Sequence, residues 1–567
     1  MRVVILGGYG VFGGRLALLL ADEPRLTLVL AGRSTAKADA FAATLPPGAR
    51  IETARVDRDG DVEAQLAALK PDVVIDATGP FQTYGERPYR VIEAALAVGA
   101  HYLDLADGAE FVDGVFAYDA AARQAGRVVL SGVSSFPVLT AAVVDALSHD
   151  MVDVRRVTGG IAPSPYAGVG LNVIRAVAGY AGKPVKLVRD GRRTAGRGLV
   201  EIVRRTVSPP GRLPLRNIRF SLVDVPDLRV LPRRRPELRD VWMGAGPVPE
   251  ILHRMLNGLA RGVAAGVLPS LEPFAPVFHR AINLLRWGEH RGGMFVDVHG
   301  VDGDGLPIHR SWHLLAEGDD GPLIPSMAAE AIVRKMLDGQ TPAPGARSAA
   351  GDLDLADYDA LFARRTIHTG VREPVPAAAP LYRRVLTGAW ERLPAPIRDL
   401  HDLDGDLRVE GTADVERGTG LASRIVGAVF GFPRAGRQVP VAVDFKLTPQ
   451  GEVWRRTFDG RSFHSVQSEG TGRFEGLVVE RFGPFAFGLA LVLEDDRLNL
   501  AVRRWTAFGV PMPAAWAPGG PAHEAAEDGR FRFHVEIGLP LVGLVVRYRG
   551  WLARADREPE APAAEAA

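Results

Sequence analysis

The sequence contains no cysteine, which excludes disulfide bonds, thiolate metal sites and cysteine nucleophiles. Lysine is also rare, because only six of the 68 basic residues are lysine, at positions 37, 70, 183, 186, 335 and 446. An excess of one charge is lacking as well: 68 basic side chains are balanced by 67 acidic ones. No overall electrostatic field therefore draws the chain to nucleic acid, and we expect no nucleic-acid partner.

Long hydrophobic runs are absent too. The most apolar stretches, Phe485–Leu493 and Leu539–Val546, are too short to span a bilayer. The N-terminus superficially resembles a signal peptide, but glycines at positions 7, 8, 10, 13 and 14 interrupt its apolar run. We therefore expect a cytoplasmic protein with no integral membrane span. Peripheral contact with a membrane surface stays open.

The 567 residues, 47% of them hydrophobic, are enough for two to four domains. Residues 1–145 alternate short apolar runs with helical segments, which predicts a Rossmann domain with a parallel, doubly wound sheet. Residues 146–370 mix strands and helices as in an α+β domain, for substrate binding or dimerisation. Residues 381–553 contain many short strands, which predict a β-rich barrel or a helix-grip-like sheet. Residues 554–567, rich in alanine, proline and glutamate, are predicted to be disordered.

Within these domains the pattern also places individual elements. The expected strands of the first domain are residues 3–6, 26–31, 51–56, 73–77, 102–105 and 128–131. Residues 249–286 are expected to be helical with a break near Pro269, and residues 381–400 are expected to form one amphipathic helix. The segment Val371–Pro380 (VREPVPAAAP) is the best candidate for a linker.

A glycine-rich loop follows the first expected strand. Gly8, Gly10 and Gly13 form the G-x-G-x-x-G spacing between an apolar strand and a helix, which is the context that dinucleotide binding requires. The first glycine permits a tight turn, the second lets the backbone approach the pyrophosphate, and the third lets the helix pack on the strand. The predicted pyrophosphate-binding residues are Gly8, Tyr9, Gly10, Val11, Phe12 and Gly13.

The end of the second expected strand distinguishes NAD from NADP. NAD enzymes usually carry an acidic residue there, bonded to the ribose 2′-hydroxyl. This chain has Arg33 and Ser34 instead, and their side chains suit a 2′-phosphate. We therefore expect NADP as cofactor, with NAD as the alternative. Asp57, which ends the third strand, either contacts the adenine or caps a turn.

Two further motifs resemble the saccharopine dehydrogenase-like oxidoreductases over residues 1 to about 365. The family pattern A-x-G-P-F-x-x-Y-G after strand four is matched by Ala77, Gly79, Pro80, Phe81, Tyr84 and Gly85, and its H-Y-x-D on strand five by His101, Tyr102 and Asp104. The fourth strand ends at the carboxyl edge of the sheet, where ligands of doubly wound sheets bind. Thr78, Gly79, Pro80 and Phe81 are accordingly expected to line the cofactor site.

The candidates for proton transfer are Tyr84, Asp104 and Asp107. Family members often read Thr-Gly-Glu after the H-Y-x-D motif, whereas this chain reads Ala106-Asp107-Gly108. No lysine is placed for catalysis, which argues against saccharopine itself as the substrate. Tyr84 is the preferred proton donor, and Asp104 is equally well explained as a structural carboxylate that binds loop amides.

The C-terminal part resembles an uncharacterised domain that is appended to saccharopine dehydrogenase-like reductases. The matching runs are Val409–Gly411, Val439–Val441, Trp454–Phe458, Glu480–Gly483 and Tyr548–Leu552. This resemblance implies no activity, so binding of a hydrophobic small molecule and a purely structural or oligomerising role both stay open. The histidines at 523 and 534 lack the spacing of a metal site, and no metal is predicted.

Two functional hypotheses follow. The first is an NADP-dependent oxidoreductase that transfers hydride to or from an apolar or bulky carbonyl, imine or enoyl substrate. The second is a catalytically silent dinucleotide-binding protein whose C-terminal module binds a hydrophobic ligand or a partner. Both imply a small-molecule ligand, and a homodimer stays open.

Overall fold

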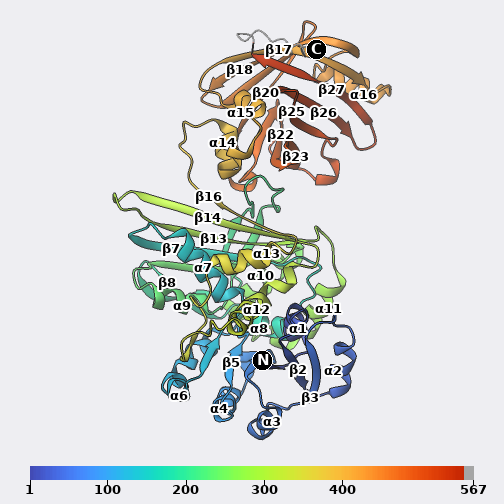
Figure 1. The fold of residues 1–567 in the computed structure, drawn as a ribbon. Helices are drawn as coiled ribbons and strands as arrows, with labels where there is room; N and C mark the ends of the chain where they lie inside the picture. Colours follow the sequence, from blue (N-terminus) through green and yellow to red (C-terminus); the bar gives the residue numbers. More distant parts are fainter. Residues whose placement is uncertain (555–567) are drawn as a thin grey trace, which may run out of the picture. The chain divides into compact units, whose positions relative to one another are not determined.

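The structure is a computed structural model that describes residues 1–554. The chain divides into two compact units: one contains residues 1–204 and 218–369, and the other contains residues 205–217 and the chain from Gly370 onward (Figure 1). A short segment from the middle of the sequence thus belongs to the C-terminal unit. Apart from Arg554, the tail expected to be disordered lies outside the described residues.

The first sheet is parallel throughout and has the order β15-β6-β5-β4-β1-β2-β3. Its central strands are apolar because helices cover both faces; Val3, Val4 and Ile5, for example, are fully buried. Strand order reverses between β1 and β4, which is the usual position of a ligand in such sheets. The strands are β1 (Arg2–Leu6), β2 (Thr27–Gly32), β3 (Arg50–Arg55), β4 (Val73–Asp76), β5 (His101–Asp104), β6 (Val128–Ser131) and β15 (Gly345–Ser348).

Helices connect successive strands of this sheet. They are α1 (Val11–Leu20), α2 (Thr35–Ala42), α3 (Val62–Leu69), α4 (Arg90–Ala97), α5 (Ala109–Gly114) and α6 (Asp119–Gln124). Ser34 and Asp61 cap α2 and α3 by accepting backbone N–H bonds from Lys37 and Ala64. The predicted Rossmann fold is confirmed.

The second sheet of this unit is mixed, which confirms the predicted α+β region. Its order is β10-β11-β12-β7-β13-β14-β16, with β7 parallel to β12 and antiparallel to β13. The strands are β7 (Asp153–Ala162), β10 (Ile202–Arg205), β11 (Ile218–Leu222), β12 (Asp240–Ala245), β13 (Arg291–Val301), β14 (Pro307–Glu317) and β16 (Ile367–Arg372), and a separate hairpin comprises β8 (Pro184–Arg189) and β9 (Arg192–Arg197).

Helices accompany this sheet, and the expected break near Pro269 separates two of them. They are α7 (Thr140–Leu147), α8 (Leu171–Tyr180), α9 (Asp227–Arg234), α10 (Glu250–Ala264), α11 (Ala275–Leu284), α12 (Ile324–Leu337) and α13 (Leu355–Phe362). No helix within residues 1–554 is both long and apolar enough to cross a membrane.

The C-terminal unit is a closed antiparallel barrel of ten strands, because β22 pairs with both β21 and β23. The barrel strands are β17 (Leu407–Arg417), β18 (Gly436–Thr448), β19 (Gly451–Phe458), β20 (Arg461–Glu469), β21 (Val478–Phe482), β22 (Phe485–Glu494), β23 (Arg497–Ala507), β25 (Ala522–Glu527), β26 (Arg530–Leu539) and β27 (Gly543–Arg554), and β24 (Val510–Pro511) extends β23. Of the two predicted folds, the barrel is confirmed.

Tight turns close several hairpins of the barrel. The turn pairs Asp459-Gly460, Asp495-Asp496 and Asp528-Gly529 all have positive φ at both residues. Such turns match the twist of the flanking strands, and glycine and aspartate tolerate them best.

One expected element of this unit is wrong. The single helix predicted over 381–400 is two short helices, α14 (Leu381–Leu386) and α15 (Ala395–His401). Thr387 adopts φ 47° at the end of α14, and Pro394 directly precedes α15. A left-handed residue and a proline both interrupt helical hydrogen bonding, so the amphipathic pattern alone was misleading.

Candidate functional site

A cavity of about 650 Å³ lies at the carboxyl edge of the parallel sheet. It is enclosed by the glycine loop, the ends of β2, β3 and β4, and the beginning of α8. Of the predicted cofactor residues, those lining it are Tyr9, Gly10, Val11, Phe12, Arg33, Asp57, Thr78, Gly79, Pro80 and Phe81. Gly8, Gly13 and Ser34 lie behind this lining.

The glycine loop is built from close backbone approaches. Gly7 has φ +74°, and a Cβ there would lie 2.9 Å from the carbonyl oxygen of Ala77. Gly7 thus shares the tight turn with Gly8, where a Cβ would lie 2.9 Å from the carbonyl oxygen of Ile5. A Cβ at Gly13 would collide with the carbonyl oxygen of Gly7, as expected for the glycine that lets α1 pack on the strand.

The amino end of α1 faces the cavity without a protein cap. Gly10 is the N-cap residue, and no side chain within the described chain bonds to the first amides of α1. These amides and the helix dipole favour an anion, so the loop fits a pyrophosphate.

The end of β2 carries Arg33, whose exposed side chain lines the cavity. The Ser34 hydroxyl accepts the Lys37 N–H at 3.4 Å, which leaves its own proton free to donate. The Ser34 N–H donates to the Tyr9 hydroxyl at 3.0 Å, so the Tyr9 ring lies over the end of the strand. An arginine fork and a serine hydroxyl thus occupy the position where NAD enzymes have a carboxylate.

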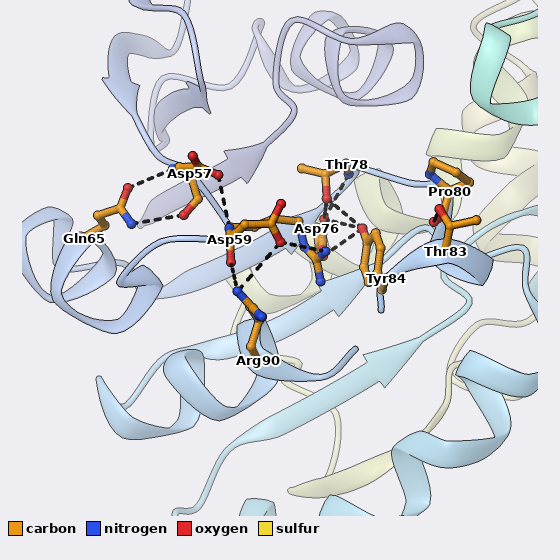
Figure 2. Close-up of polar contacts among 10 residues, drawn as sticks. Asp57, Asp59, Gln65, Asp76, Thr78, Pro80, Thr83, Tyr84 and Arg90 are labelled. Carbon is orange, nitrogen blue, oxygen red and sulfur yellow. Dashed lines mark hydrogen bonds and ion pairs between the residues drawn. The ribbon is translucent and has the colours of Figure 1, made fainter. Parts of the chain in front are cut away.

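Asp57 both lines the cavity and caps a turn. Its carboxylate accepts the Asp59 N–H at 3.1 Å, and its own N–H donates to the Gln65 side chain at 2.8 Å (Figure 2). The neighbouring Arg58 also lines the cavity, and its guanidinium lies 3.4 Å from the centre of the Tyr84 ring. Its Nε and one terminal nitrogen have no hydrogen-bond partner among residues 1–554. Sequence reasoning missed Arg58, although it follows Asp57 directly.

The loop after β4 is held from both sides. Asp76 accepts the Thr78 N–H at 2.9 Å and the Thr78 hydroxyl at 2.6 Å. The side chain of Asn172, on α8, donates to the Gly79 carbonyl at 2.7 Å. These bonds fix the wall formed by Thr78, Gly79 and Pro80, and the peptide bond between the last two is cis.

Tyr84 has its hydroxyl engaged beside the sheet edge. This hydroxyl lies 2.7 Å from the Thr78 hydroxyl and 3.3 Å from both Asp76 oxygens, and Figure 2 shows it directed toward them. Burial and the Asp76 charge raise the pKa of Tyr84. Although the ring lines the cavity, the predicted donor atom is bonded to Asp76 and Thr78.

Asp104 is fully buried and lies outside the cavity lining. One of its oxygens accepts the N–H groups of Ala106 at 3.0 Å and Gly132 at 2.8 Å, together with the Ser131 hydroxyl at 3.0 Å. Burial raises its pKa to about 7. This position corresponds to the interpretation of Asp104 as a structural carboxylate that binds loop amides, and not to its interpretation as a proton-transfer group.

Asp107 is the predicted acid that reaches the cavity. It is half-buried and accepts a hydrogen bond from the Gln82 amide at 3.0 Å. Burial raises the pKa of its carboxyl. Burial, followed by the charges of Asp107 and Asp224, raises the pKa of Tyr180. Neither Tyr180 nor Asp224 was singled out from the sequence, because residues on α8 and after β11 approach the site only in the folded chain.

Comparison with known families gives two matches. The family described as saccharopine dehydrogenase NADP binding domain matches residues 3–130, and the domain of unknown function DUF4166 matches residues 393–552. None of the curated proteins that we compared matches the chain.

Several solved structures are similar at low identity. Apo saccharopine dehydrogenase (L-Glu forming) from Saccharomyces cerevisiae is 13% identical, with a TM-score of 0.46 over 66% of this chain and 100% of that one. A meso-DAPDH mutant from Clostridium tetani E88 is 13% identical, with a TM-score of 0.31 over 63% and 95%. The WlbA dehydrogenase from Thermus thermophilus in complex with NAD and alpha-ketoglutarate is 13% identical, with a TM-score of 0.29 over 60% and 90%.

The family match falls on the part of the chain that forms the glycine loop and strands β1 to β6. The second match falls on the barrel. The chain therefore contains a domain that matches the saccharopine dehydrogenase NADP binding domain and a C-terminal DUF4166 domain, and it is a dinucleotide-dependent oxidoreductase.

Proposed function

We propose that this oxidoreductase uses NADP and reduces or forms a carbonyl, imine or enoyl group in an apolar or bulky substrate. The observation that carries the proposal is the single cavity that joins the glycine loop, Arg33 and the loop after β4. When bound, the reduced nicotinamide supplies the hydride. The chain's own residues bind the cofactor, orient the substrate and supply a proton.

Arg33 is the main support for NADP over NAD. Its planar guanidinium can bind a 2′-phosphate with two hydrogen bonds, and the Ser34 hydroxyl can add a third. Because no carboxylate ends β2, nothing at that position repels the phosphate or holds the 2′-hydroxyl of NAD. Arg58, with nitrogen atoms that make no hydrogen bond among the described residues, adds positive charge to the same side of the cavity.

The lining near α8 supports an apolar substrate. Leu171 and Val173 contribute to it from the helix, and Leu105 contributes from the end of β5. Such a wall gains free energy by burying hydrocarbon, whereas a dicarboxylic substrate would need cations there.

Titration with NADPH and NADH tests the cofactor assignment. We expect saturable binding of NADPH, measured by its fluorescence, with a dissociation constant at least about tenfold below that of NADH, a difference of about 1.4 kcal/mol. Gly13→Val is the matched negative control, because its side chain collides with the Gly7 carbonyl and displaces the loop. Equal affinity for the two cofactors would contradict NADP preference. Unchanged NADPH binding by Gly13→Val would contradict the site itself.

Asp107 is our proposed proton donor, with Tyr84 as the alternative. Asp107 lines the cavity, and its raised pKa keeps a proton available at higher pH than for an exposed carboxyl. In a carbonyl or imine, the Asp107 proton would go to the oxygen or nitrogen, which takes up the electron pair when the double-bonded carbon receives the hydride. In an enoyl compound, the hydride would go to the β-carbon and the proton to the α-carbon.

Asp107→Asn is expected to slow substrate-dependent NADPH oxidation by about a hundredfold or more, because the amide cannot donate an acidic proton. NADPH affinity should change by less than about twofold, since Asp107 is not assigned to the cofactor. The measurement is a single-turnover assay with a panel of apolar aldehydes, ketones, imines and enoyl compounds. If Tyr84→Phe abolishes turnover while Asp107→Asn does not, the two roles are reversed.

A further inference from the structure

The barrel encloses a second cavity, distinct from the dinucleotide site, of about 630 Å³. Ten phenylalanines, three tryptophans and one tyrosine contribute to its lining, together with aliphatic residues. A helix, α16 (Leu421–Val429), contributes Val426, and Phe430 follows directly after it. Small-molecule sites typically have volumes of roughly 300 to 1,000 Å³ and apolar walls with few polar groups. The cavity has these properties.

Every charged side chain in the lining already has a partner within the barrel unit. Arg456 forms an ion pair with Glu480 at 3.1 Å, and both side chains are 13% exposed. Glu536 pairs with Arg547 at 2.7 Å, and Glu524 bonds to His401 at 2.7 Å.

The remaining ionisable lining residues are His523 and Tyr548. Burial, followed by the charges of His534 and Arg497, lowers the pKa of His523, and burial raises the pKa of Tyr548 to about 12, so both are neutral at physiological pH. An ionic ligand would therefore find no free counter-charge in the wall and would lose its hydration without compensation.

The Arg456–Glu480 pair is held in place by its neighbours. The Ser465 hydroxyl donates to Glu480 at 2.6 Å and accepts from Arg456 at 2.9 Å, and the Gln467 amide donates to Glu480 at 3.3 Å. Arg456 also lies over the Trp454 ring, 5.0 Å from its centre. This arrangement keeps the arginine from turning toward an incoming anion.

We propose that the barrel is a binding site for an uncharged, hydrophobic small molecule. The ligand class is a long or fused hydrocarbon with at most a hydroxyl or carbonyl group. At roughly 30 Å³ for each non-hydrogen atom, the volume accommodates about 20 such atoms. The proposal assigns a function to a domain whose family description gives none, and it is independent of the NADP assignment.

The first experiment uses the full chain and two ligands that differ in charge. Nile red, an uncharged dye that fluoresces in apolar surroundings, is titrated to saturation and then displaced with dodecanol or dodecanoate. We expect dodecanol to displace the dye at a concentration at least about tenfold lower than dodecanoate does. Absence of saturable dye binding, or equal displacement by the two, would overturn the proposal.

Two tryptophan substitutions locate the bound dye. Val535 is half-buried in the lining, so Val535→Trp fills part of the cavity, whereas Lys446→Trp adds the same side chain on an exposed position of β18. Val535→Trp is expected to weaken Nile red binding at least about tenfold, and Lys446→Trp by less than about twofold. Wild-type affinity in Val535→Trp would place the dye elsewhere and overturn the proposal.

A third substitution tests whether the pairing of charges in the cavity wall is what disfavours an ionic ligand. It changes a charge in the wall without filling the cavity. Glu480→Gln leaves Arg456 without its carboxylate partner. Dodecanoate should then displace the dye at least about tenfold better than from the wild-type protein, while dodecanol changes little. If dodecanoate displaces no better from Glu480→Gln, charge pairing does not set the selectivity, and the proposal of an uncharged ligand fails.

Discussion

Replacing Arg33 by aspartate is expected to weaken NADPH binding by about a hundredfold or more, which corresponds to about 3 kcal/mol. The loss has two parts. Charge-assisted hydrogen bonds between the guanidinium and the 2′-phosphate contribute about 1.5 to 3 kcal/mol, and the new carboxylate repels the phosphate. The same carboxylate can accept the ribose 2′-hydroxyl of NADH, so NADH affinity should stay equal or improve. Paired fluorescence titrations measure both constants.

The control for Arg33→Asp is Arg50→Asp. Arg50 is exposed at the start of β3, at the opposite end of the strand from the cavity, and the change in net charge is identical. It is expected to alter NADPH affinity by less than about threefold, since screening weakens distant surface charges. An unchanged ratio of NADPH to NADH affinity in Arg33→Asp would refute the role of Arg33. Equal losses of NADPH affinity in Arg33→Asp and Arg50→Asp would mean that only the net charge of the protein affects binding.

The cofactor half of the site was largely predictable from the sequence because it is local. A strand, a glycine loop and a helix within about fifteen residues determine where the pyrophosphate binds, and Arg33 ends the next strand. The motif did not include Gly7, which shares the tight turn with Gly8. The spacing of the glycines does not say which residue has positive φ, and here it is Gly7, which approaches the chain at Ala77.

The substrate half was not predictable in the same way. Tyr180 on α8 and Asp224 after β11 approach Asp107 only through the packing of the folded chain. The seventh strand of the parallel sheet, β15, lies more than 200 residues after β6 in the sequence and has only four residues. Short strands with distant partners give no periodic signal that a single sequence reveals.

The barrel was predicted from its short strands and turn residues, and its closure required the structure. Alternation places residues on one face or the other, but it does not say whether the last strand pairs with the first. Pairing between the first barrel strand, β17, and the last, β27, closes the ring and converts alternating aromatics into a cavity wall. Arg456 on β19 pairs with Glu480 on β21, which is not an adjacent strand, and Glu524 on β25 bonds to His401 on α15. The neutrality of the cavity is therefore also a property of the fold.

The buried carboxyl of Asp104 gives the second large expected effect, on stability against pH. Asp104 adjoins Asp76 in the register of β4 and β5, and both side chains are fully buried. Burial raises the pKa of Asp104 to about 7 despite three hydrogen bonds to one oxygen, and its other oxygen has no partner within residues 1–554. In the unfolded chain the pKa is about 4.

The sign of the effect follows from these two values. Below pH 4 Asp104 is protonated in both the folded and the unfolded chain, and its full contribution to the free energy of unfolding is present. Between pH 4 and 7 the unfolded chain releases the proton while the folded chain retains it, so the free energy of unfolding falls as pH rises. Three pH units correspond to a loss of about 4 kcal/mol, and above pH 7 the contribution is constant.

Asp104→Asn is expected to remove this pH dependence. The amide oxygen can accept the same bonds from Ala106, Gly132 and Ser131, but the side chain cannot ionise. Urea unfolding of variant and wild type at pH 4 and pH 8 measures the result: relative to the wild type, the variant should gain up to about 4 kcal/mol at the higher pH. Asp59→Asn, at a side chain 70% exposed beside the same sheet edge, is the control and should show no such gain. A difference between Asp104→Asn and wild type that is the same at both pH values would mean that folding does not raise the pKa of Asp104. Its role as a buried carboxyl that keeps its proton up to about pH 7 would then be wrong.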